Sequence, residues 1–203
     1  MTINNALSTN SLRPSVLAAV YLGSKNGSSP IYCKCASELA KQLAQRKIGI
    51  VYGGANVGTM KYLADSAIKN NSYIIGVFPK GFKGKEEVRL ANIEIEKHNL
   101  NEIIYTKDLC ERKIIMEQLS NFCIILPGSL GTLDEFAQYA VNKQLKFHNK
   151  RLYILNINNF FLPLKLLLDN MVKEEFMPEG DLSSFIFCNS IDQILSNIDS
   201  FEL

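Results

Sequence analysis

The sequence predicts a protein of the α/β class, with a doubly wound and mainly parallel sheet flanked by helices. Short apolar runs recur along the 203 residues, and each is followed by a segment with helical spacing of its apolar residues. Several runs are apolar on consecutive residues, which suits strands buried on both faces of a parallel sheet. Regular alternation of strand and helix is typical of this class and indicates one domain built on one sheet.

Six apolar runs are the expected strands, and six further segments are the expected helices. The strands are Val16–Leu22, Ile48–Tyr52, Tyr73–Phe78, Phe122–Leu126, Leu152–Ile157 and Phe185–Cys188. The helices are Ile31–Gln45, Val57–Asn70, Asp108–Ser120, Leu133–Lys146, Leu162–Glu174 and Ile191–Ile198. The segment Lys80–Lys97 is charged and lacks clear periodicity, so we expect a loop with a short element there.

Length and composition exclude several kinds of protein. A chain with 47% hydrophobic and 21% charged residues fits one folded domain and excludes a largely disordered chain. The 22 Lys and Arg against 20 Asp and Glu leave a net charge of +2, which is too even to predict a nucleic-acid partner. Residues 1–14 are polar and are expected as a flexible N-terminal tail, not a signal peptide, with the folded domain at 15–203. Without a stretch of about 18 apolar residues, the sequence predicts no membrane span.

The five cysteines predict reduced thiols in a cytoplasmic protein. Their number is odd, no Cys-x-x-Cys pair occurs, and Cys123 and Cys188 lie inside apolar runs. Cys33 and Cys35 form a poor zinc half-site, and the chain has only two histidines, so we expect no bound metal.

Three turns that contain glycine follow the expected strands, at residues 23–29, 53–58 and 127–132. Because ligands of an open parallel sheet bind beyond the carboxyl ends of its strands, these turns are expected to meet in one site. Backbone N–H groups and the positive ends of helix dipoles favour an anion there, so we expect a phosphate or a nucleotide. The alternative is that each glycine only permits a tight turn. A Walker motif is absent, and so is Gly-x-Gly-x-x-Gly after the first strand, which disfavours a P-loop NTPase and NAD binding.

Two carboxylates follow the last of these turns. Glu135 lies three residues after Thr132, at the start of the next expected helix and beside the expected phosphate-binding turn. Asp134 is its neighbour, and because adjacent helical residues diverge, we expect only one of the two to face a ligand. The alternative for Thr132 and Glu135 is a capping box that only stabilises the start of the helix.

A basic pair, Arg112 and Lys113, lies early in the helix expected over Asp108–Ser120. Positive charge at this end opposes the helix macrodipole, and a role in binding phosphate or ribose oxygens would explain it. The alternative is a surface pair that is neutralised by Asp108 and Glu111.

Four segments form a series of motifs. They are Tyr52–Met60 (YGGANVGTM), Glu111–Met116 (ERKIIM), Leu126–Glu135 (LPGSLGTLDE) and Gln144–Lys150 (QLKFHNK). Together they resemble the LONELY GUY (LOG) family, whose members are cytokinin riboside 5′-monophosphate phosphoribohydrolases and are often mislabelled as possible lysine decarboxylases. The resemblance runs from about Val16 to Ile198, and its most specific part is the combination of ERK with PGxxGTxxE.

The resemblance implies a Rossmann-like fold, usually as a homodimer or higher homo-oligomer. It also implies hydrolysis of the N-glycosidic bond of a purine nucleoside 5′-monophosphate, such as AMP, to free base and ribose 5-phosphate. Glu135 and Arg112 match the family's catalytic positions. The turns and the resemblance together define an expected substrate-binding set: Gly23, Ser24, Gly53, Gly54, Lys113, Gly128, Ser129, Leu130, Gly131, Thr132 and Asp134.

The implied reaction requires no cofactor and no metal, because a fixed carboxylate can stabilise the positive charge that develops on the sugar. Lysine decarboxylation is rejected on chemical grounds. The sequence does not present the Schiff-base lysine with its carboxylate partner that pyridoxal-phosphate catalysis needs.

A further glutamate of the family precedes the arginine, and two positions compete for it. Counting forward from Gly76–Pro79 reaches Glu86, whereas counting back from Arg112 reaches Glu94 and keeps more matches. The two counts differ by eight residues, so an insertion is expected within Lys80–Lys97.

Some residues depart from the family pattern. Ser129 stands in place of the second glycine of PGGxGT, and Val141-Asn142 stands in place of Thr-Trp, which removes a hydroxyl from the substrate-binding set. Two functions therefore remain open. One is a phosphoribohydrolase, and the other is a non-catalytic nucleotide- or phosphate-binding protein that uses the same pocket.

Overall fold

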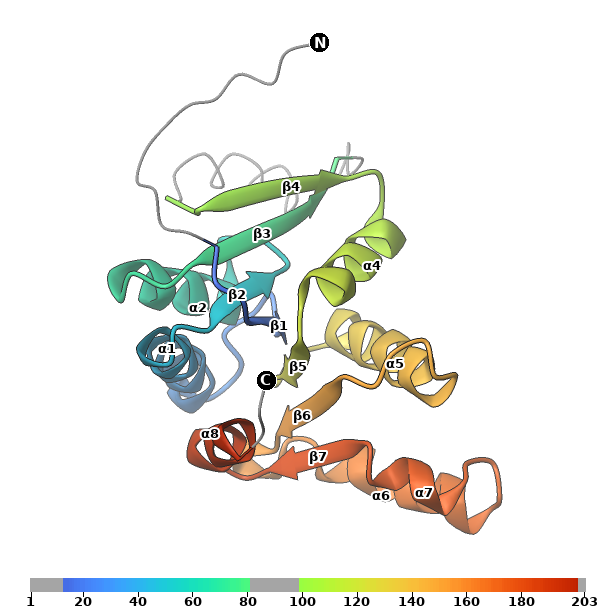
Figure 1. The fold of residues 1–203 in the computed structure, drawn as a ribbon. Helices are drawn as coiled ribbons and strands as arrows, with labels where there is room; N and C mark the ends of the chain where they lie inside the picture. Colours follow the sequence, from blue (N-terminus) through green and yellow to red (C-terminus); the bar gives the residue numbers. More distant parts are fainter. Residues whose placement is uncertain (1–12, 81–98, 201–203) are drawn as a thin grey trace.

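A seven-stranded parallel sheet forms the centre of the described chain (Figure 1). The structure, a computed structural model, describes residues 13–80 and 99–200. The strands lie in the order β4-β3-β2-β1-β5-β6-β7, and every neighbouring pair is parallel. Their bounds are β1 Leu17–Tyr21, β2 Gly49–Tyr52, β3 Ile74–Pro79, β4 Glu102–Thr106, β5 Phe122–Ile125, β6 Arg151–Leu155 and β7 Phe185–Cys188. The predicted α/β fold is therefore confirmed.

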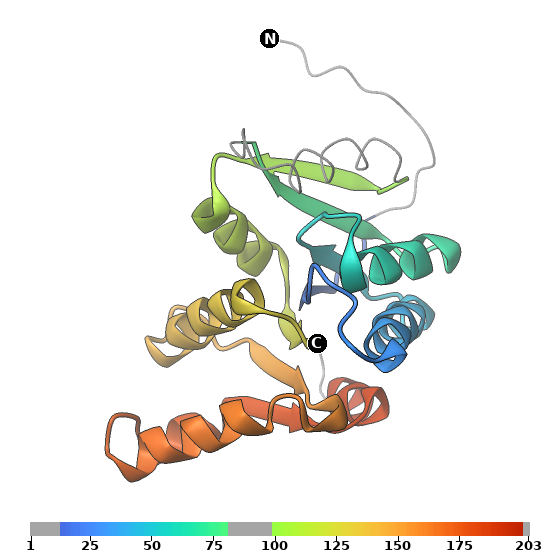
Figure 2. The ribbon, with the colours of Figure 1, turned by 180° about the vertical axis from the view of Figure 1, so that it is seen from behind.

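Helices cover both faces of this sheet, and Figure 2 shows the same layers from behind. Helices α1, α2 and α8 cover one face, while α4, α5, α6 and the short α7 cover the other. Their bounds are α1 Pro30–Gln45, α2 Gly58–Lys69, α4 Leu109–Leu119, α5 Leu130–Gln144, the 3-10 turn η1 Ile157–Asn159, α6 Leu162–Lys173, α7 Glu179–Leu182 and α8 Ile191–Asp199. Of the helices in the described ranges, none has the length and apolar character needed to cross a membrane.

Alternating strand residues contribute to two hydrophobic cores, one on each face of the sheet. Along β1, Ala18 and Val20 pack in the core with α1, α2 and α8, whereas Leu17, Ala19 and Tyr21 pack in the core with α4, α5 and α6. All five side chains are buried. Because successive side chains of a strand point to opposite faces and both faces are covered, the strand has a continuous apolar sequence.

The sequence pattern does not predict the edge strand β4. It pairs with β3 from Ile75↔Glu102 to Pro79↔Thr106, but Ile103 and Tyr105 are exposed. A five-residue strand that is covered on one face only has no continuous apolar run. The sequence pattern therefore does not distinguish β4 from the charged segment before it. Residues 81–97 of that segment lie outside the described residues, as do residue 98 and residues 1–12 of the expected tail.

The order of the strands reverses at β1, and this reversal positions the site. Strands β2, β3 and β4 lie on one side of β1, and β5, β6 and β7 lie on the other. The chain enters α1 on one face after β1, and it enters α5 on the opposite face after β5. Such a switch point leaves a crevice between the two turns, where ligands of open α/β sheets bind.

Candidate active site

The turns after β1 and β5 approach each other closely, and each has a glycine at the point of approach. A Cβ atom on Gly23 would lie 3.3 Å from the Cα of Gly128, and one on Gly128 would overlap the side chain of Thr132. At the start of α2, the Thr59 hydroxyl donates a hydrogen bond of 2.9 Å to the carbonyl oxygen of Gly23. The three glycine-containing turns that follow β1, β2 and β5 thus meet at one edge of the sheet.

Helix α5 begins three residues earlier than the sequence predicts. Its N-cap is Ser129, whose side chain makes no capping hydrogen bond, and Leu130 is the first helical residue. Glu135 therefore lies in the second turn, and the alternative of a capping box between Thr132 and Glu135 is wrong. Thr132 is instead buried against Gly128. Because the first N–H groups of a helix have no acceptor within it, this end of α5 offers donors and a positive dipole end to an anion.

Arg112 and Glu135 form an ion pair between α4 and α5. Arg112 Nη2 lies 2.5 Å from Glu135 Oε1, and the exposed fractions of the two side chains are 17% and 8%. The guanidinium also lies against Gly53 at the end of β2, where a Cβ atom would be 3.4 Å from Arg112 Nη1. The pair therefore connects the helix after β5 with the turn after β2.

The two acids at the start of α4 do not neutralise Arg112. Asp108 is the N-cap, and its carboxylate accepts a hydrogen bond of 2.8 Å from the backbone N–H of Glu111. The Glu111 carboxylate accepts one of 2.5 Å from the backbone N–H of Lys107. The alternative of a surface pair neutralised by Asp108 and Glu111 is wrong, because both cations are largely buried and each forms an ion pair with an acid of α5.

Glu135 has an unusual protonation equilibrium. Burial raises the pKa of Glu135 to about 7 against the lowering effect of Arg112, with smaller contributions from Asp134 and Lys113. A carboxyl group that titrates near neutral pH is typical of sites that use charge or proton transfer.

A second ion pair lies beside the first. Lys113 Nζ is 2.7 Å from Asp134 Oδ1, and the exposed fractions of these side chains are 9% and 59%. The neighbouring carboxylates diverge as the sequence predicts: Glu135 is buried against Arg112, whereas Asp134 is exposed and pairs with the buried Lys113. Each of the two cations of α4 is therefore matched by one acid of α5.

The Gly-Gly turn after β2 has two distinct parts. Gly54 has a φ of +77°, and a Cβ atom on it would overlap the ring of Phe78. The Tyr52 hydroxyl donates a hydrogen bond of 3.2 Å to the Gly54 carbonyl oxygen. Gly54 thus shapes the turn, whereas Gly53 faces the guanidinium of Arg112.

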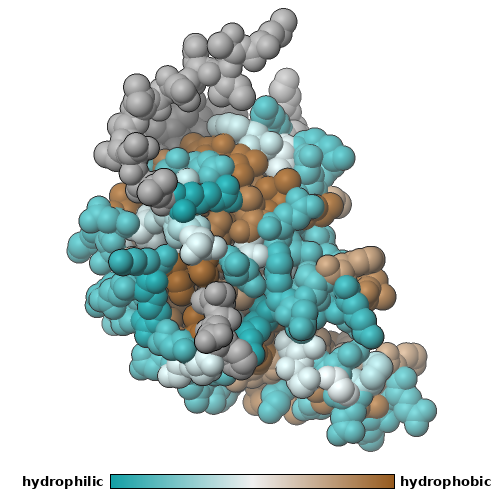
Figure 3. Space-filling model, viewed as in Figure 1, coloured by the Kyte–Doolittle hydropathy of each residue, from teal (hydrophilic) through white to brown (hydrophobic). Residues whose placement is uncertain are grey.

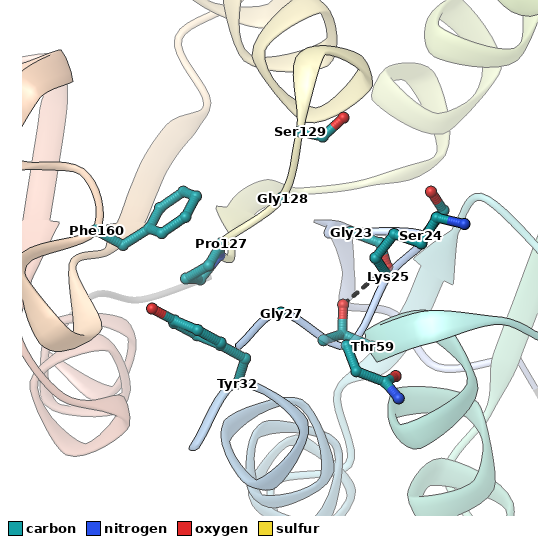
Figure 4. A pocket seen from close by; sticks show the side chains of 11 residues that line it. Gly23, Ser24, Lys25, Gly27, Tyr32, Thr59, Pro127, Gly128, Ser129 and Phe160 are labelled. Atoms are coloured by element: carbon teal, nitrogen blue, oxygen red, sulfur yellow. Dashed lines mark hydrogen bonds between the residues drawn. The ribbon is translucent and has the colours of Figure 1, made fainter. Parts of the chain in front are cut away.

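A cavity of about 140 Å³ opens between the turns after β1 and β5 (Figure 4). Four residues of the expected substrate-binding set line it, namely Gly23, Ser24, Gly128 and Ser129. Its other end is lined by Tyr32 of α1 and by Phe160, which follows η1. No sequence pattern singles out these two aromatic residues, because they are far apart in the chain. Arg112 and Glu135 are not among the lining residues.

Leu130 and Gly131 of the expected substrate-binding set do not line the cavity. The Leu130 side chain is 81% exposed, and a Cβ atom on Gly131 would meet no atom within 4 Å. Glu86 and Glu94 lie outside the described residues, so the choice between them stays a prediction. Among residues 13–80 and 99–200, no three His, Cys, Asp or Glu side chains cluster as a metal site would require, and all five cysteines are free.

A polar cluster links the C-terminal half of α4 to the end of α5. Glu117 Oε2 accepts a hydrogen bond of 2.8 Å from Asn142 Nδ2, and Glu117 Oε1 lies 3.7 Å from His148 Nε2. Lys150 Nζ donates to the Glu117 carbonyl oxygen over 2.5 Å. The unusual Asn142 therefore holds α5 to α4, while its neighbour Val141 is 48% exposed.

The fold and the site together define a doubly wound α/β protein with a buried arginine–glutamate pair at the glycine-rich edge of its sheet. Residues 60–198 match a protein-family model described as "Possible lysine decarboxylase". The chain is 32% identical over 181 residues to a cytokinin riboside 5′-monophosphate phosphoribohydrolase of Rhodococcoides fascians, covering 89% of this chain and 88% of that protein. It is 34% identical over 158 residues to a probable enzyme of the same name from Arabidopsis thaliana, covering 78% and 75%. The chain belongs to this family, which is the LOG family that its motifs resemble.

Solved structures with the same fold are more distant in sequence. The molybdenum cofactor binding protein of Rippkaea orientalis is 22% identical, with a TM-score of 0.63 and coverage of 94% of this chain and 98% of that one. The molybdenum cofactor carrier protein of Chlamydomonas reinhardtii is 18% identical, with a TM-score of 0.63 and coverage of 91% and 96%. At these identities the likeness shows a shared fold alone.

Proposed function

We propose that this protein hydrolyses the N-glycosidic bond of a purine nucleoside 5′-monophosphate, with adenine or an N6-substituted adenine as base. The products are the free base and ribose 5-phosphate. The observation that carries this proposal is the buried Arg112–Glu135 pair beside the glycine turns and the start of α5. The names of the relatives, which are phosphoribohydrolases at about one-third identity, support the same reaction class.

The phosphate is the anchor of the substrate in this proposal. Backbone N–H groups of residues 128–132 and the dipole of α5 attract it, and Gly23 and Ser24 close the opposite side of the turn. A phosphate held there fixes the ribose relative to Glu135, so that binding energy is used to orient the reacting bond. A nucleoside without the phosphate loses this anchor and is expected to be a poor substrate.

Glu135 is the catalytic carboxylate in this proposal. As the bond between C1′ and the base nitrogen breaks, positive charge develops on the sugar, and a carboxylate stabilises it and orients a water molecule. The water oxygen bonds to C1′, one of its protons is released, and the departing base takes up a proton. Arg112 holds the carboxylate of Glu135 in place, and both groups lie in a water-poor environment where charge interactions are strong.

The direct test is release of base from AMP and from an isopentenyl-type adenine ribotide, measured by chromatography. Glu135→Gln keeps the size of the side chain and removes its charge, and Glu38→Gln on the outer side of α1 is the matched control. The control should keep the parent rate. If no purine 5′-monophosphate releases base, the enzymatic function is excluded, and if Glu135→Gln releases base at the parent rate, the site assignment is excluded.

A non-catalytic nucleotide-binding protein is the second candidate. The observation that favours it is that Ser129 lines the cavity at a position where the family usually has glycine. The same experiment separates the two candidates, since AMP would then bind in calorimetry while no adenine appears.

A homodimer or higher homo-oligomer also belongs to this proposal. Exposed apolar side chains on α4, on α5 and at the C-cap of α5 support it, among them Ile114, Leu133 and Leu145. Figure 3 shows apolar surface near the end of α5. Patches of this kind on adjoining helices are typical of protein interfaces. Light scattering should give at least twice the mass of one chain, and Leu145→Glu should lower that mass.

The free thiols support a cytoplasmic location. Cys123 and Cys188 are buried without partners for a disulfide, and Cys110 is exposed and free. Fractionation of cells that express the tagged protein would place it with the cytoplasmic fraction.

A further inference from the structure

One end of the cavity between the turns after β1 and β5 is aromatic, and the proposed reaction makes no use of it. Tyr32 and Phe160 meet there edge to face, with ring centroids 5.9 Å apart and ring planes at 72°. Figure 4 shows both rings beside Pro127, on the side of the cavity away from Ser24 and Lys25. The cavity thus joins an aromatic end to an end that is built from turn residues.

Local structure holds Phe160 in this position. Asn158 and Asn159 have φ values of +51° and +55°, a backbone conformation that asparagine tolerates better than most residues. The Asn156 side chain accepts a hydrogen bond of 2.8 Å from the N–H of Phe161. The buried ring of Phe161 packs against Phe160, with centroids 4.9 Å apart. Phe160 is therefore supported from behind, while 39% of its surface stays exposed.

Local structure also holds the ring of Tyr32, the other aromatic residue at this end of the cavity. Gly27 has a φ of +74°, and a Cβ atom on it would lie only 2.6 Å from Cδ2 of the Tyr32 ring. Any other residue at this position would displace the ring or the turn. The turn after β1 and the Tyr32 ring are thus fitted to each other.

The reacting pair and the aromatic end lie on opposite sides of the glycine turns. The guanidinium of Arg112 lies against Gly53 at the end of β2, whereas Phe160 follows β6. Strands β1 and β5, whose carboxyl ends carry the two turns, lie between β2 and β6 in the sheet. With neighbouring strands about 4.8 Å apart, β2 and β6 are separated by about 14 Å. A nucleotide with its sugar at Glu135 and its phosphate at the turns therefore points its phosphate, and not its base, toward the aromatic end.

The size of the cavity limits what it can hold. Pockets for complete small molecules measure about 300–1,000 Å³, and a cavity of about 150 Å³ accommodates one benzene-sized ring. At about 140 Å³, this cavity suits a single ring and is too small for a whole nucleotide.

We infer that the cavity is a subsite for a ring-sized aromatic or apolar group attached to the substrate through its 5′-phosphate. The ligand class is a nucleotide 5′-phosphodiester, in which one phosphate oxygen carries the group that packs against Tyr32 and Phe160. This subsite rests on the proposed function, because the phosphate at the glycine turns is the anchor that both share.

The test compares the phenyl ester and the methyl ester of AMP, which carry the same charge and differ only in the ring. Calorimetric titrations use the Glu135→Gln chain, so that neither ester is consumed. We expect the phenyl ester to bind about tenfold more tightly than the methyl ester, because part of the ring is removed from water. Phe160→Ala in the same background should bring the ratio of the two affinities close to one. Phe176→Ala, which changes a phenylalanine that does not line the cavity, should leave the ratio at about tenfold.

Three results would overturn the inference. The first is that the phenyl ester does not bind, or binds no better than the methyl ester. The second is that Phe160→Ala changes neither the two affinities nor their ratio. The third is an equal loss of affinity for both esters in Phe160→Ala, because the aromatic end would then hold the base. Failure of the proposed function has a different signature, namely no release of base from AMP by the unaltered chain, and it leaves the ratio of the two esters as measured.

Discussion

Glu135 shows how a single residue acquires its character from its surroundings. An exposed glutamate is fully ionised at neutral pH, but burial in the angle between α4 and α5 raises the pKa of this one to about 7. Arg112 opposes that shift and so favours the ionised form of Glu135 near neutral pH. The same contact fixes the direction of the carboxylate, so position and protonation are controlled by one neighbour.

This protonation equilibrium predicts the pH dependence of catalysis. Because only the ionised form of Glu135 stabilises positive charge on the sugar, kcat/KM for AMP should rise with pH and level off above about pH 7. Glu135→Gln should lower kcat/KM by roughly 10²–10⁴-fold and abolish the inflection. Initial rates between pH 5 and pH 9 measure both effects. A profile that is flat through pH 7 in the unaltered chain would contradict the role given to Glu135.

At the scale of elements, the two glycines near the start of α5 differ in the space around them. Gly128 packs against Thr132 and lies next to the backbone of Gly23, so it has no room for a Cβ atom. Gly131, only three residues later, faces open space in the first turn of the helix. The two glycines of one motif therefore have different physical reasons to be present.

Alanine substitutions of Gly128 and of Gly131 form a matched pair of variants. Gly128→Ala should destabilise the fold and weaken phosphate binding, because the Thr132 side chain must move and the turn must open. Gly131→Ala should be neutral or stabilise by up to about 1 kcal/mol, because alanine favours helix more than glycine does. Urea denaturation and AMP titration of both variants measure these effects. Equal stability of the two variants would show that the close approach at Gly128 is unimportant.

The contacts between α4 and α5 predict a second effect at this scale. Glu117→Ala removes the acceptor of Asn142 and the acidic neighbour of His148, so it should lower the free energy of unfolding by about 1–3 kcal/mol. Glu38→Ala, which changes a surface glutamate of α1, should alter it by less than about 0.5 kcal/mol. Chemical denaturation of both variants is the measurement. A Glu117→Ala chain as stable as the Glu38→Ala control would mean that the polar cluster contributes nothing to holding α5.

At the scale of the whole molecule, the site joins segments from both halves of the sheet. Gly23, Gly53 and Gly128 follow strands on the two sides of the switch point, and α4 and α5 bring Arg112 and Glu135 over them. A ligand that contacts all of these segments stabilises the folded state as one unit, because the unfolded chain cannot bind it.

Ligand binding should therefore raise the melting temperature in a way that depends on the phosphate. AMP at 100 times its Kd should add about 2.7 kcal/mol of stability. For a chain of this size, that corresponds to an increase in Tm of about 5–10 °C. Adenosine at the same concentration should cause a much smaller shift, because it lacks the group that the turns bind. Thermal denaturation of the Glu135→Gln chain with each ligand makes the comparison without hydrolysis, and equal shifts would contradict a phosphate anchor.

How far the sequence predicts the fold depends on how each element is buried. Strands such as β1 and β5 are covered on both faces, and their continuous apolar residues mark them clearly. Strand β4 is covered on one face only, so Ile103 and Tyr105 leave no comparable signal. The start of α5 is misplaced by three residues because Gly131 and exposed Leu130 resemble a turn more than a helix.

The amino-acid sequence alone determines the α/β class, the glycine turns and the candidates Glu135 and Arg112. These depend on apolar periodicity and on motifs within short stretches of chain. Only the folded arrangement shows that Arg112 pairs with Glu135 across 23 residues, and that Tyr32 and Phe160 share a cavity. Such contacts depend on the order of the strands, which reverses at β1, and on the residue at which each helix begins. Both are set by packing among elements that are distant in the chain, and no local pattern of residues encodes them.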